Sequence, residues 1–313
     1  MDYYNDFLKK LKNAIDSNGK NTSLKNFVDE ELAQMYEKIL MDEQRGSNHK
    51  LIMPSTLPVS LKRLNNLALD KDLTLNFYFS HTYVLNLDRR PDRLDKMKKG
   101  LDKAGIYNWT RWSAIDGKES PHYDEWTNYR RSRMTYYERR RYHRKAIGSP
   151  GSWAILKSMY GMLQDAIKKK YHSILVLQDD LLFHKRFREK FLEIPNTVPK
   201  NWKLLYLGAT QHSWTHAEFR PKYYFPMGTA DGAFAVGIHH SLYKEMLDEI
   251  VKFDAPFDSG CLKTIQKRHG RQCLILSPNL VIADIRDSDL RKSRDLVAYG
   301  KQFRWDIKDY VLS

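Results

Sequence analysis

The chain has 313 residues, of which 42% are hydrophobic and 12% aromatic, so it can bury a core and is not a low-complexity or disordered protein. Its formal charge of +15 indicates an anionic partner: nucleic acid, membrane headgroups or a phosphorylated small molecule. The two cysteines form no disulfide or zinc pattern, and the sequence shows neither a signal peptide nor an apolar membrane span. We therefore expect a globular cytoplasmic protein, either free or peripheral at a membrane.

The first 70 residues differ in pattern from the rest of the chain. Apolar residues at helical spacing predict helices up to about residue 45, and residues 45–66 are rich in Ser, Asn and Pro, which indicates a loop. We therefore expect a helical N-terminal extension over residues 1–70 and a main domain over residues 71–313.

In the main domain, short apolar runs alternate with helical segments, which indicates an α/β fold with a mostly parallel central sheet. Strands are predicted at residues 82–87, 111–115, 173–177, 204–207, 233–238, 273–276 and 280–282. Helices are predicted at residues 89–105, 153–168, 241–253 and 259–269.

The strongest local signal is an acidic strand end. The apolar run at residues 173–177 leads through Gln178 into Asp179 and Asp180 and returns at once to Leu181. In open α/β sheets ligands lie at the carboxyl ends of strands, and Mg²⁺ or Mn²⁺ bound by one or two carboxylates can complete its shell with substrate phosphates. The alternative is a solvated turn after a buried strand, and this segment alone does not separate the two.

Two other predicted strands also end in polar residues. The strand at 82–87 leads into DRRPDR, where Arg93 and its neighbours at the start of a helix could hold an anion. The alternative there is a solvated first helical turn. The strand at 111–115 ends in Asp116, which could accept hydrogen bonds from a ribose or a base, or could cap a turn.

Taken in order, these segments resemble glycosyltransferase family 25, which contains lipooligosaccharide and collagen galactosyltransferases. The resemblance covers about residues 80–295 and rests on VLNLDRRPDR, AIDG, LVLQDDLLF, LLYLG, GAFAV and PNLVIADIRDSDLR. It implies a GT-A-type nucleotide-binding fold, a UDP-sugar donor and a divalent cation. It also implies transfer of a hexose, with inversion, to the hydroxyl of a glycan, lipid-linked or protein acceptor.

The resemblance further implies roles for individual residues. The expected ligands of Mn²⁺ or Mg²⁺ are Asp180, Asp179 and Asp284. Contacts to the nucleotide-sugar are expected from Asn86, Leu87, Arg93, Asp116 and Asp179. Asp289 is a further candidate in the segment of Asp284, with capping of the next helix as the alternative.

Two positions depart from the family pattern. Gln178 stands where the relatives usually have Glu, so the acidic site loses one charge. Met159 stands where many relatives have a histidine after a serine, here Ser158, so the role of that histidine is absent or served elsewhere. A catalytically inert relative is therefore one alternative.

An inverting displacement needs a group that takes the proton of the acceptor hydroxyl as the new bond forms. Asp258, in an element that matches a Pro-x-Asp element of the relatives, is the first candidate. Asp231 is the second, because the adjacent glycine permits close approach of the backbone to a substrate. A turn or cap role is the alternative for both, and His212, although at a strand end, is interpreted as structural.

The segment from Tyr129 to Lys145 contributes much positive charge. Its arginines and interleaved tyrosines could bind nucleic acid by phosphate contacts and stacking, which gives an alternative function in a different class. They could also contact anionic membrane headgroups, or form a solvated segment over the donor site.

Overall fold

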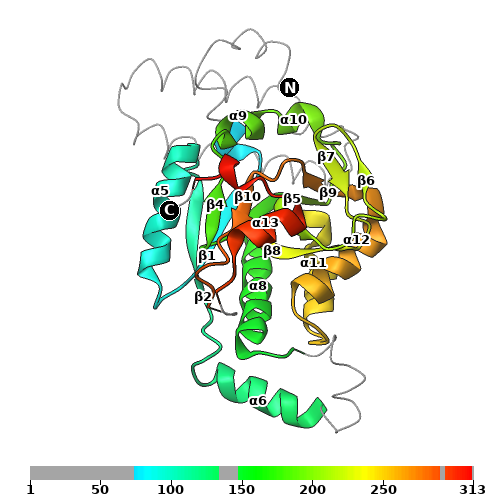
Figure 1. The fold of residues 1–313 in the computed structure, drawn as a ribbon. Coiled ribbons are helices and arrows are strands. Elements are labelled where there is room, and N and C mark those ends of the chain that lie inside the picture. Colours follow the sequence, from blue (N-terminus) through cyan, green and yellow to red (C-terminus); the bar gives the residue numbers. More distant parts are fainter. Residues whose placement is uncertain (1–73, 134–146, 290–292, 312–313) are drawn as a thin grey trace, which may run out of the picture. The chain divides into compact units, whose positions relative to one another are not determined.

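The computed structural model describes residues 74–133, 147–289 and 293–311 (Figure 1). The extension predicted at residues 1–70 and most of the basic segment lie outside these residues, so both stay predictions, as does the domain boundary. Among the described residues, no helix is long and apolar enough to cross a membrane.

An eight-stranded sheet in the order β2-β1-β3-β8-β5-β9-β7-β6 forms the centre of the domain (Figure 1). Its strands are β1 (His81–Leu87), β2 (Trp109–Ala114), β3 (Ser173–Gln178), β5 (Leu204–Gln211), β6 (Glu218–Phe219), β7 (Tyr223–Phe225), β8 (Ala230–His239) and β9 (Cys273–Leu276). The strand pairings leave β7 and β8 antiparallel to all the other strands. The predicted α/β fold with a mostly parallel sheet is therefore confirmed.

Both faces of this sheet are buried, which explains why its central strands carry long apolar runs. In β3, Leu175 and Leu177 belong to one hydrophobic cluster, whereas Ile174 and Val176 belong to another. Successive side chains of a strand point to opposite faces, so each cluster fills the space between one face and its helices.

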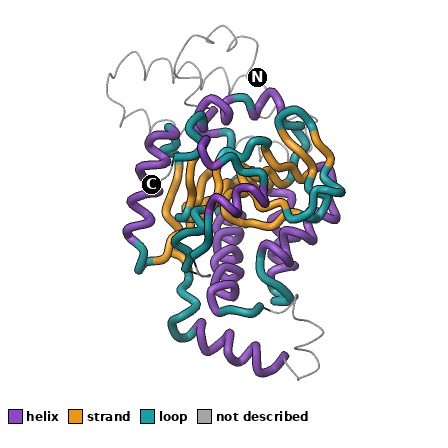
Figure 2. Tube along the Cα trace, viewed as in Figure 1, coloured by secondary structure: helices purple, strands orange, loops and turns teal. Residues whose placement is uncertain are grey.

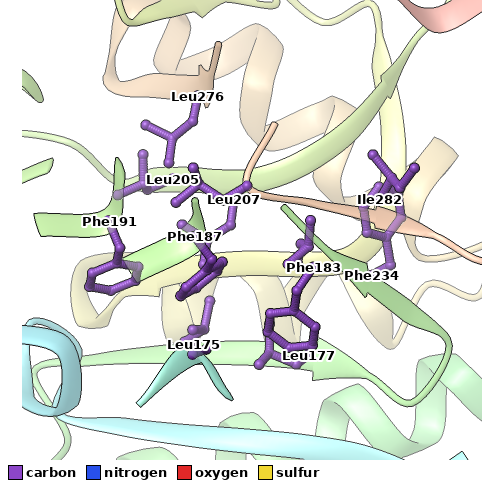
Figure 3. Close-up of a cluster of buried hydrophobic side chains, with 14 of the residues drawn as sticks. Leu175, Leu177, Phe183, Phe187, Phe191, Leu205, Leu207, Phe234, Leu276 and Ile282 are labelled. Carbon is purple, nitrogen blue, oxygen red and sulfur yellow. The ribbon is translucent and has the colours of Figure 1, made fainter. Parts of the chain in front are cut away.

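Helices cover the two faces of the sheet in two sets (Figure 2). One set comprises α5 (Pro91–Ala104), α9 (Phe187–Leu192), α10 (Ile194–Thr197) and α13 (Leu296–Phe303). The other comprises α8 (Pro150–Lys168), α11 (Tyr243–Ile250) and α12 (Lys263–His269), and α6 (His122–Arg133) packs on α8 rather than on the sheet. Figure 3 shows the first cluster, in which Phe187 and Phe191 of α9 lie near the leucines of β3 and β5.

The ends of the two long predicted helices follow from capping residues. The helix predicted at 153–168 begins earlier, at Pro150, because the side chain of Ser149 accepts a hydrogen bond from the Ser152 N–H at 3.2 Å. The helix predicted at 89–105 ends at Ala104, where Gly105 adopts a left-handed conformation with φ of 76°.

A second sheet of two strands lies over the first. It pairs β4 (Leu181–Phe183) with β10 (Val281–Ala283) in antiparallel register, with Ala283 opposite Leu181. The strand β10 passes so close to β5 that a Cβ atom on Gly208 would lie 2.0 Å from the carbonyl oxygen of Val281. Because Gly208 has no side chain, β10 can cross β5 at this short distance. The crossing places Asp284, which follows β10, next to Asp180.

Several elements differ from the sequence expectation. The helix predicted at 259–269 is divided into a π-helical turn, η2 (Asp258–Leu262), and α12, and the helix predicted at 241–253 ends at Ile250. The following described elements were not predicted: α6, α9, α10, α13, β4, β6 and β7. Most of them are short, and a strand of two or three residues has no periodicity that the sequence could display.

Candidate functional site

Polar residues gather at one edge of the main sheet. The strands β1, β2 and β3 are parallel neighbours, so their carboxyl ends, and the residues that follow them, meet at this edge. The amino end of β8 lies at the same edge because β8 runs antiparallel to β3 and β5. The sheet therefore brings the predicted acidic segment and the predicted Asp231 to the same side of the domain.

Asp179 and Asp180 form the centre of the acidic group. The side chain of Asp179 is 9% exposed, and burial raises its pKa against the opposing effects of Asn86 and Arg93. Burial and then repulsion by Asp179 raise the pKa of Asp180 to about 7. The Oδ1 atom of Asp180 is buried and has no hydrogen-bond partner among the described residues. A buried carboxylate oxygen without a partner is unfavourable unless a cation or a proton is bound to it.

Asp284 is the third carboxylate of this group. Its backbone N–H donates a hydrogen bond of 2.6 Å to the carbonyl oxygen of Asp180. Burial raises the pKa of Asp284, but the hydrogen bonds from the Arg286 side chain, two of 2.7 Å, and from its backbone N–H, together with the charges of Arg286 and Lys96, outweigh burial and lower the pKa. Asp284 is therefore ionised beside Asp180, as the predicted set of metal ligands requires.

A layer of arginines faces these carboxylates. Arg93, which is 6% exposed, lies 3.3 Å from Asp179 and 3.0 Å from Asp289. Arg90 lies 2.9 Å from Asp289, and Arg89 bridges Asp289 at 2.7 Å and Asp116 at 2.5 Å. The guanidinium groups are thus held in place by carboxylates at the beginning of α5, where an anionic ligand would also meet the helix N-terminus.

Asn86 connects the strand β1 to this layer. Its Nδ2 atom donates to Asp179 Oδ2 at 2.6 Å and to the carbonyl oxygen of Arg90 at 2.9 Å, and its Oδ1 atom accepts from Arg111 Nε at 2.9 Å. The neighbouring Leu87 accepts the Arg90 N–H through its carbonyl oxygen at 2.9 Å. Asn86 and Leu87 therefore shape the turn before α5. Arg111 was missed from the sequence because it lies at an exposed position of β2 rather than at a strand end.

Asp116 makes the contacts of a turn residue, which was the alternative to a contact with a ribose or a base. Its Oδ1 atom accepts the Lys118 N–H at 2.9 Å, while Oδ2 contacts Arg89. At Gly117 a Cβ atom would lie 2.0 Å from the carbonyl oxygen of Pro150, so this turn packs directly on the start of α8. A nucleotide contact by Asp116 stays a prediction.

Ser158 and Met159 lie in the interior. The Ser158 hydroxyl accepts the Ile115 N–H at 3.0 Å, and Met159 is 1% exposed within the hydrophobic cluster under α8. Met159 is thus a core residue in this chain, and another side chain has to supply any imidazole of the site.

A second polar group lies at the start of β8. Asp231 contacts Nε2 of His212 at 3.2 Å through Oδ2 and Nζ of Lys263 at 2.8 Å through Oδ1. His212 follows the carboxyl end of β5, and Thr210 pairs with Asp231 across the two strands. His212 therefore has a carboxylate partner, which a lone histidine in the sequence could not reveal.

Asp258 begins the π-helical turn η2. Its Oδ1 atom accepts the N–H of Ser259 at 2.7 Å, which is a local turn contact. Lys263, at the start of α12 directly after η2, is the residue that reaches Asp231. The catalytic role of Asp258 stays a prediction.

A cleft of about 1280 Å³ opens beside the acidic group. Asp179, Asp180 and Asp284 line one part of it, and Phe183 of β4 and Phe187 of α9 line another. Three basic residues of α5 also line it: Lys96, Lys99 and Lys103. The cleft therefore joins a carboxylate cluster, suited to a hard cation, to a positively charged wall, suited to an anion.

Only the beginning of the basic segment belongs to the described residues. Tyr129 donates a hydrogen bond of 2.8 Å to the carbonyl oxygen of Phe253, and its ring lies 4.9 Å from that of Trp153. The guanidinium of Arg130 lies over the ring of Trp126 at 5.0 Å. These two side chains pack on the domain, and the remainder of the segment up to Lys145 keeps its three interpretations.

Comparison with known proteins connects this geometry to a family. Residues 79–227 match the model of glycosyltransferase family 25, described as an LPS biosynthesis protein family. These residues contain β1, α5, β3 and both aspartates of the acidic strand end.

Several curated proteins are similar to about two fifths of the chain. A procollagen lysyl hydroxylase and glycosyltransferase of Acanthamoeba polyphaga mimivirus is 30% identical over 141 residues, 41% of this chain and 15% of that protein. A glycosyltransferase 25 family member of Drosophila melanogaster is 29% identical over 40% of this chain and 20% of its own length. Procollagen galactosyltransferase 2 of Mus musculus is 26% identical over 42% of this chain and 21% of its own length.

The chain thus matches about a fifth or less of each of these relatives. A solved glycosyltransferase involved in glycosylation of the major capsid of PBCV-1 aligns with 54% of this chain and 65% of its own, at 12% identity. Its TM-score of 0.27 is too low to show a common fold. The family match and the curated relatives confirm that this chain resembles glycosyltransferase family 25.

Proposed function

We propose that this chain is an inverting glycosyltransferase with a GT-A-type fold, which uses a divalent cation to transfer a hexose from a UDP-sugar to an acceptor hydroxyl. The observation that carries the proposal is the buried Oδ1 of Asp180, which has no hydrogen-bond partner among the described residues and lies within the segment that matches the family model. Asp179 and Asp284 are the two carboxylates beside it. Glycan, lipid-linked and protein acceptors all stay open.

Asp180, Asp179 and Asp284 would hold Mn²⁺ or Mg²⁺, since hard cations take carboxylate oxygens. Bound there, the cation would offset negative charge on the diphosphate of the donor. Gln178 contributes no charge, so we expect weaker cation binding than in relatives with a third acid at the strand end.

Arg93 and its neighbours Arg89 and Arg90 would orient the donor diphosphate. Their guanidinium groups are already fixed by ion pairs with Asp289 of 2.7 to 3.0 Å, so little side-chain freedom is lost when an anion binds. The basic side of the cleft along α5 would attract the same anion.

We assign the proton acceptor to the pair of His212 and Asp231. The acceptor oxygen forms its bond to the anomeric carbon as the bond between that carbon and the diphosphate oxygen breaks, and the bonding electrons leave with UDP. Nδ1 of His212 would take the hydroxyl proton, because Asp231 already contacts Nε2 and fixes the ring orientation. Asp258 is the competing candidate.

The test measures UDP release from a panel of UDP-hexoses with and without Mn²⁺, together with the thermal shift caused by UDP and Mn²⁺. Asp180→Asn should lower UDP release at least about 100-fold and abolish the thermal shift, because the cation ligand is lost. His212→Gln should lower UDP release by about 100-fold or more while the thermal shift is retained, because general bases contribute this much to rate.

Asp248→Asn, on the exposed side of α11, removes one negative charge as Asp180→Asn does. It should leave UDP release and the thermal shift unchanged. Full metal-stimulated activity in Asp180→Asn would overturn the assignment of the cation ligand. A thermal shift without UDP release in the unaltered chain would instead indicate the inert relative. If Asp258→Asn shows the pattern expected of His212→Gln, the base is Asp258.

A further inference from the structure

Three histidines form a cluster at the edge of the sheet opposite to the acidic group. His172 directly precedes β3, His239 is the last residue of β8, and His240 begins the following 3₁₀ turn, η1 (His240–Leu242). Since Ser173 pairs with His239, the antiparallel strands place the amino end of one beside the carboxyl end of the other. The His240 N–H also donates to the His172 carbonyl oxygen at 2.9 Å, which fixes the backbone of the cluster.

The side chains of the cluster converge. Nε2 of His172 lies 3.1 Å from Nε2 of His239, and one nitrogen of each of the three rings lies within 4.8 Å of the others. The ring centroids of His172 and His239 are 4.6 Å apart, and each lies 4.4 Å from that of His240.

We propose that His172, His239 and His240 bind a transition-metal ion of the zinc type. A tetrahedral ion with imidazole ligands at about 2.0–2.1 Å holds two ligand nitrogens about 3.3 Å apart, close to the separation of the first two nitrogens here. Imidazole ligands select Zn²⁺, Cu²⁺ or Ni²⁺ over Mg²⁺ and Ca²⁺, so this site differs in chemistry from the carboxylate group. The third nitrogen belongs to the exposed His240 and lies within 4.8 Å of the other two, so it would have to come closer when the ion binds.

Contacts with Ser241 set the orientation of the His239 ring. Nδ1 of His239 accepts the Ser241 N–H at 3.3 Å and lies 2.9 Å from Oγ of the same residue, so Nε2 is the nitrogen that faces His172. Lys203, whose charge acts on His239, is hydrogen-bonded through Nζ to Nδ1 of His269 at 3.1 Å. An ion held by all three rings would join β3 to β8 and stabilise the folded chain, whether or not the chain is a transferase.

The inference is tested by calorimetric titration of the EDTA-treated full chain with ZnCl₂ in saturating MgCl₂, which occupies the carboxylate group. We expect one Zn²⁺ per chain, and an increase in melting temperature that MgCl₂ does not produce. His240→Gln should weaken binding at least about tenfold, and His239→Gln should abolish it. Because His240 is exposed, its variant should fold even if His239→Gln does not.

His216→Gln, which changes an exposed histidine elsewhere, is the matched control and should bind Zn²⁺ like the unaltered chain. Asp180→Asn should also keep the Zn²⁺ titration, which separates this site from the proposed transferase site. The inference is overturned if the unaltered chain binds no Zn²⁺, if His240→Gln and a folded His239→Gln bind it normally, or if Asp180→Asn abolishes binding. Loaded with Co²⁺, the chain should show the visible absorption of a four-coordinate ion, and His240→Gln should reduce it.

Discussion

At the scale of single residues, burial decides which groups can carry charge. Asp180 has a raised pKa because its carboxylate is buried near other acids, and such a carboxylate is suited to binding a cation. His81 is the opposite case. It is 6% exposed, stacks on the ring of Tyr171 at 4.8 Å, and its Nε2 is 2.8 Å from Oγ1 of Thr110. Burial, and then Lys169, lower its pKa from 6.5 to about 4.

The lowered pKa of His81 predicts a loss of stability in mild acid. Below pH 6.5 the unfolded chain binds a proton at this residue that the folded chain does not bind until about pH 4. The free energy of unfolding therefore decreases as the pH falls through this window, by up to about 3 kcal/mol in total. Urea unfolding at a series of pH values should show that His81→Gln loses part of this dependence. His216→Gln should keep it, and an unchanged slope in His81→Gln would contradict the assignment.

At the scale of elements, the crossing of β10 over β5 completes the acidic group. The crossing depends on Gly208, because any side chain there would meet the carbonyl oxygen of Val281. The motif LLYLG thus has a structural reason for its glycine that lies outside its own strand.

Gly208→Ala should displace β10 and with it Asp284. We expect a destabilisation of about 1–3 kcal/mol, as for other overpacked sites, and a loss of the thermal shift caused by UDP and Mn²⁺. Gly148→Ala is the control, because nothing lies within 4 Å of a Cβ atom at that position. Urea unfolding of both variants checks the prediction. Equal free energies of unfolding would show that β10 can shift to accommodate the added methyl group without loss of stability.

Sequence patterns were sufficient for the elements that carry long apolar runs. The strand β9 has the predicted bounds, and β3 extends the prediction by a single residue, because buried central strands are apolar throughout. The acidic group could be anticipated because Asp179 and Asp180 end such a strand. The partnership of His212 with Asp231 could not, since it depends on β5 and β8 being neighbours in the sheet, and no local pattern encodes that pairing.

At the scale of the whole molecule, the charge of +15 is distributed so that acidic and basic groups meet in one cleft. Lys96, Lys99 and Lys103 lie on the same side of α5 at intervals of three and four residues. None of these lysines forms an ion pair within the described ranges, so their charge is available to an anionic ligand.

Reversal of one of these charges should therefore weaken donor binding. For Lys99→Glu we expect KM for the UDP-sugar to rise about two- to fivefold at low salt and to approach the normal value in 0.5 M NaCl, where charges are screened beyond about 4 Å. Lys168→Glu, at the exposed end of α8, makes the same change of charge at the other edge of the sheet. Equal KM values for the two variants would show that the donor does not approach along α5.

The pairing of β4 with β10 also sets the order in which the carboxylates can come together during protein synthesis. Asp179 and Asp180 are synthesised before β5, β8 and β9, whereas Asp284 is synthesised after them. A nascent chain that has folded its first strands therefore has an open acidic edge without its third carboxylate. If the proposed cation site is correct, firm cation binding requires β10 as well as β3, and a chain that ends before β10 should bind the cation only weakly.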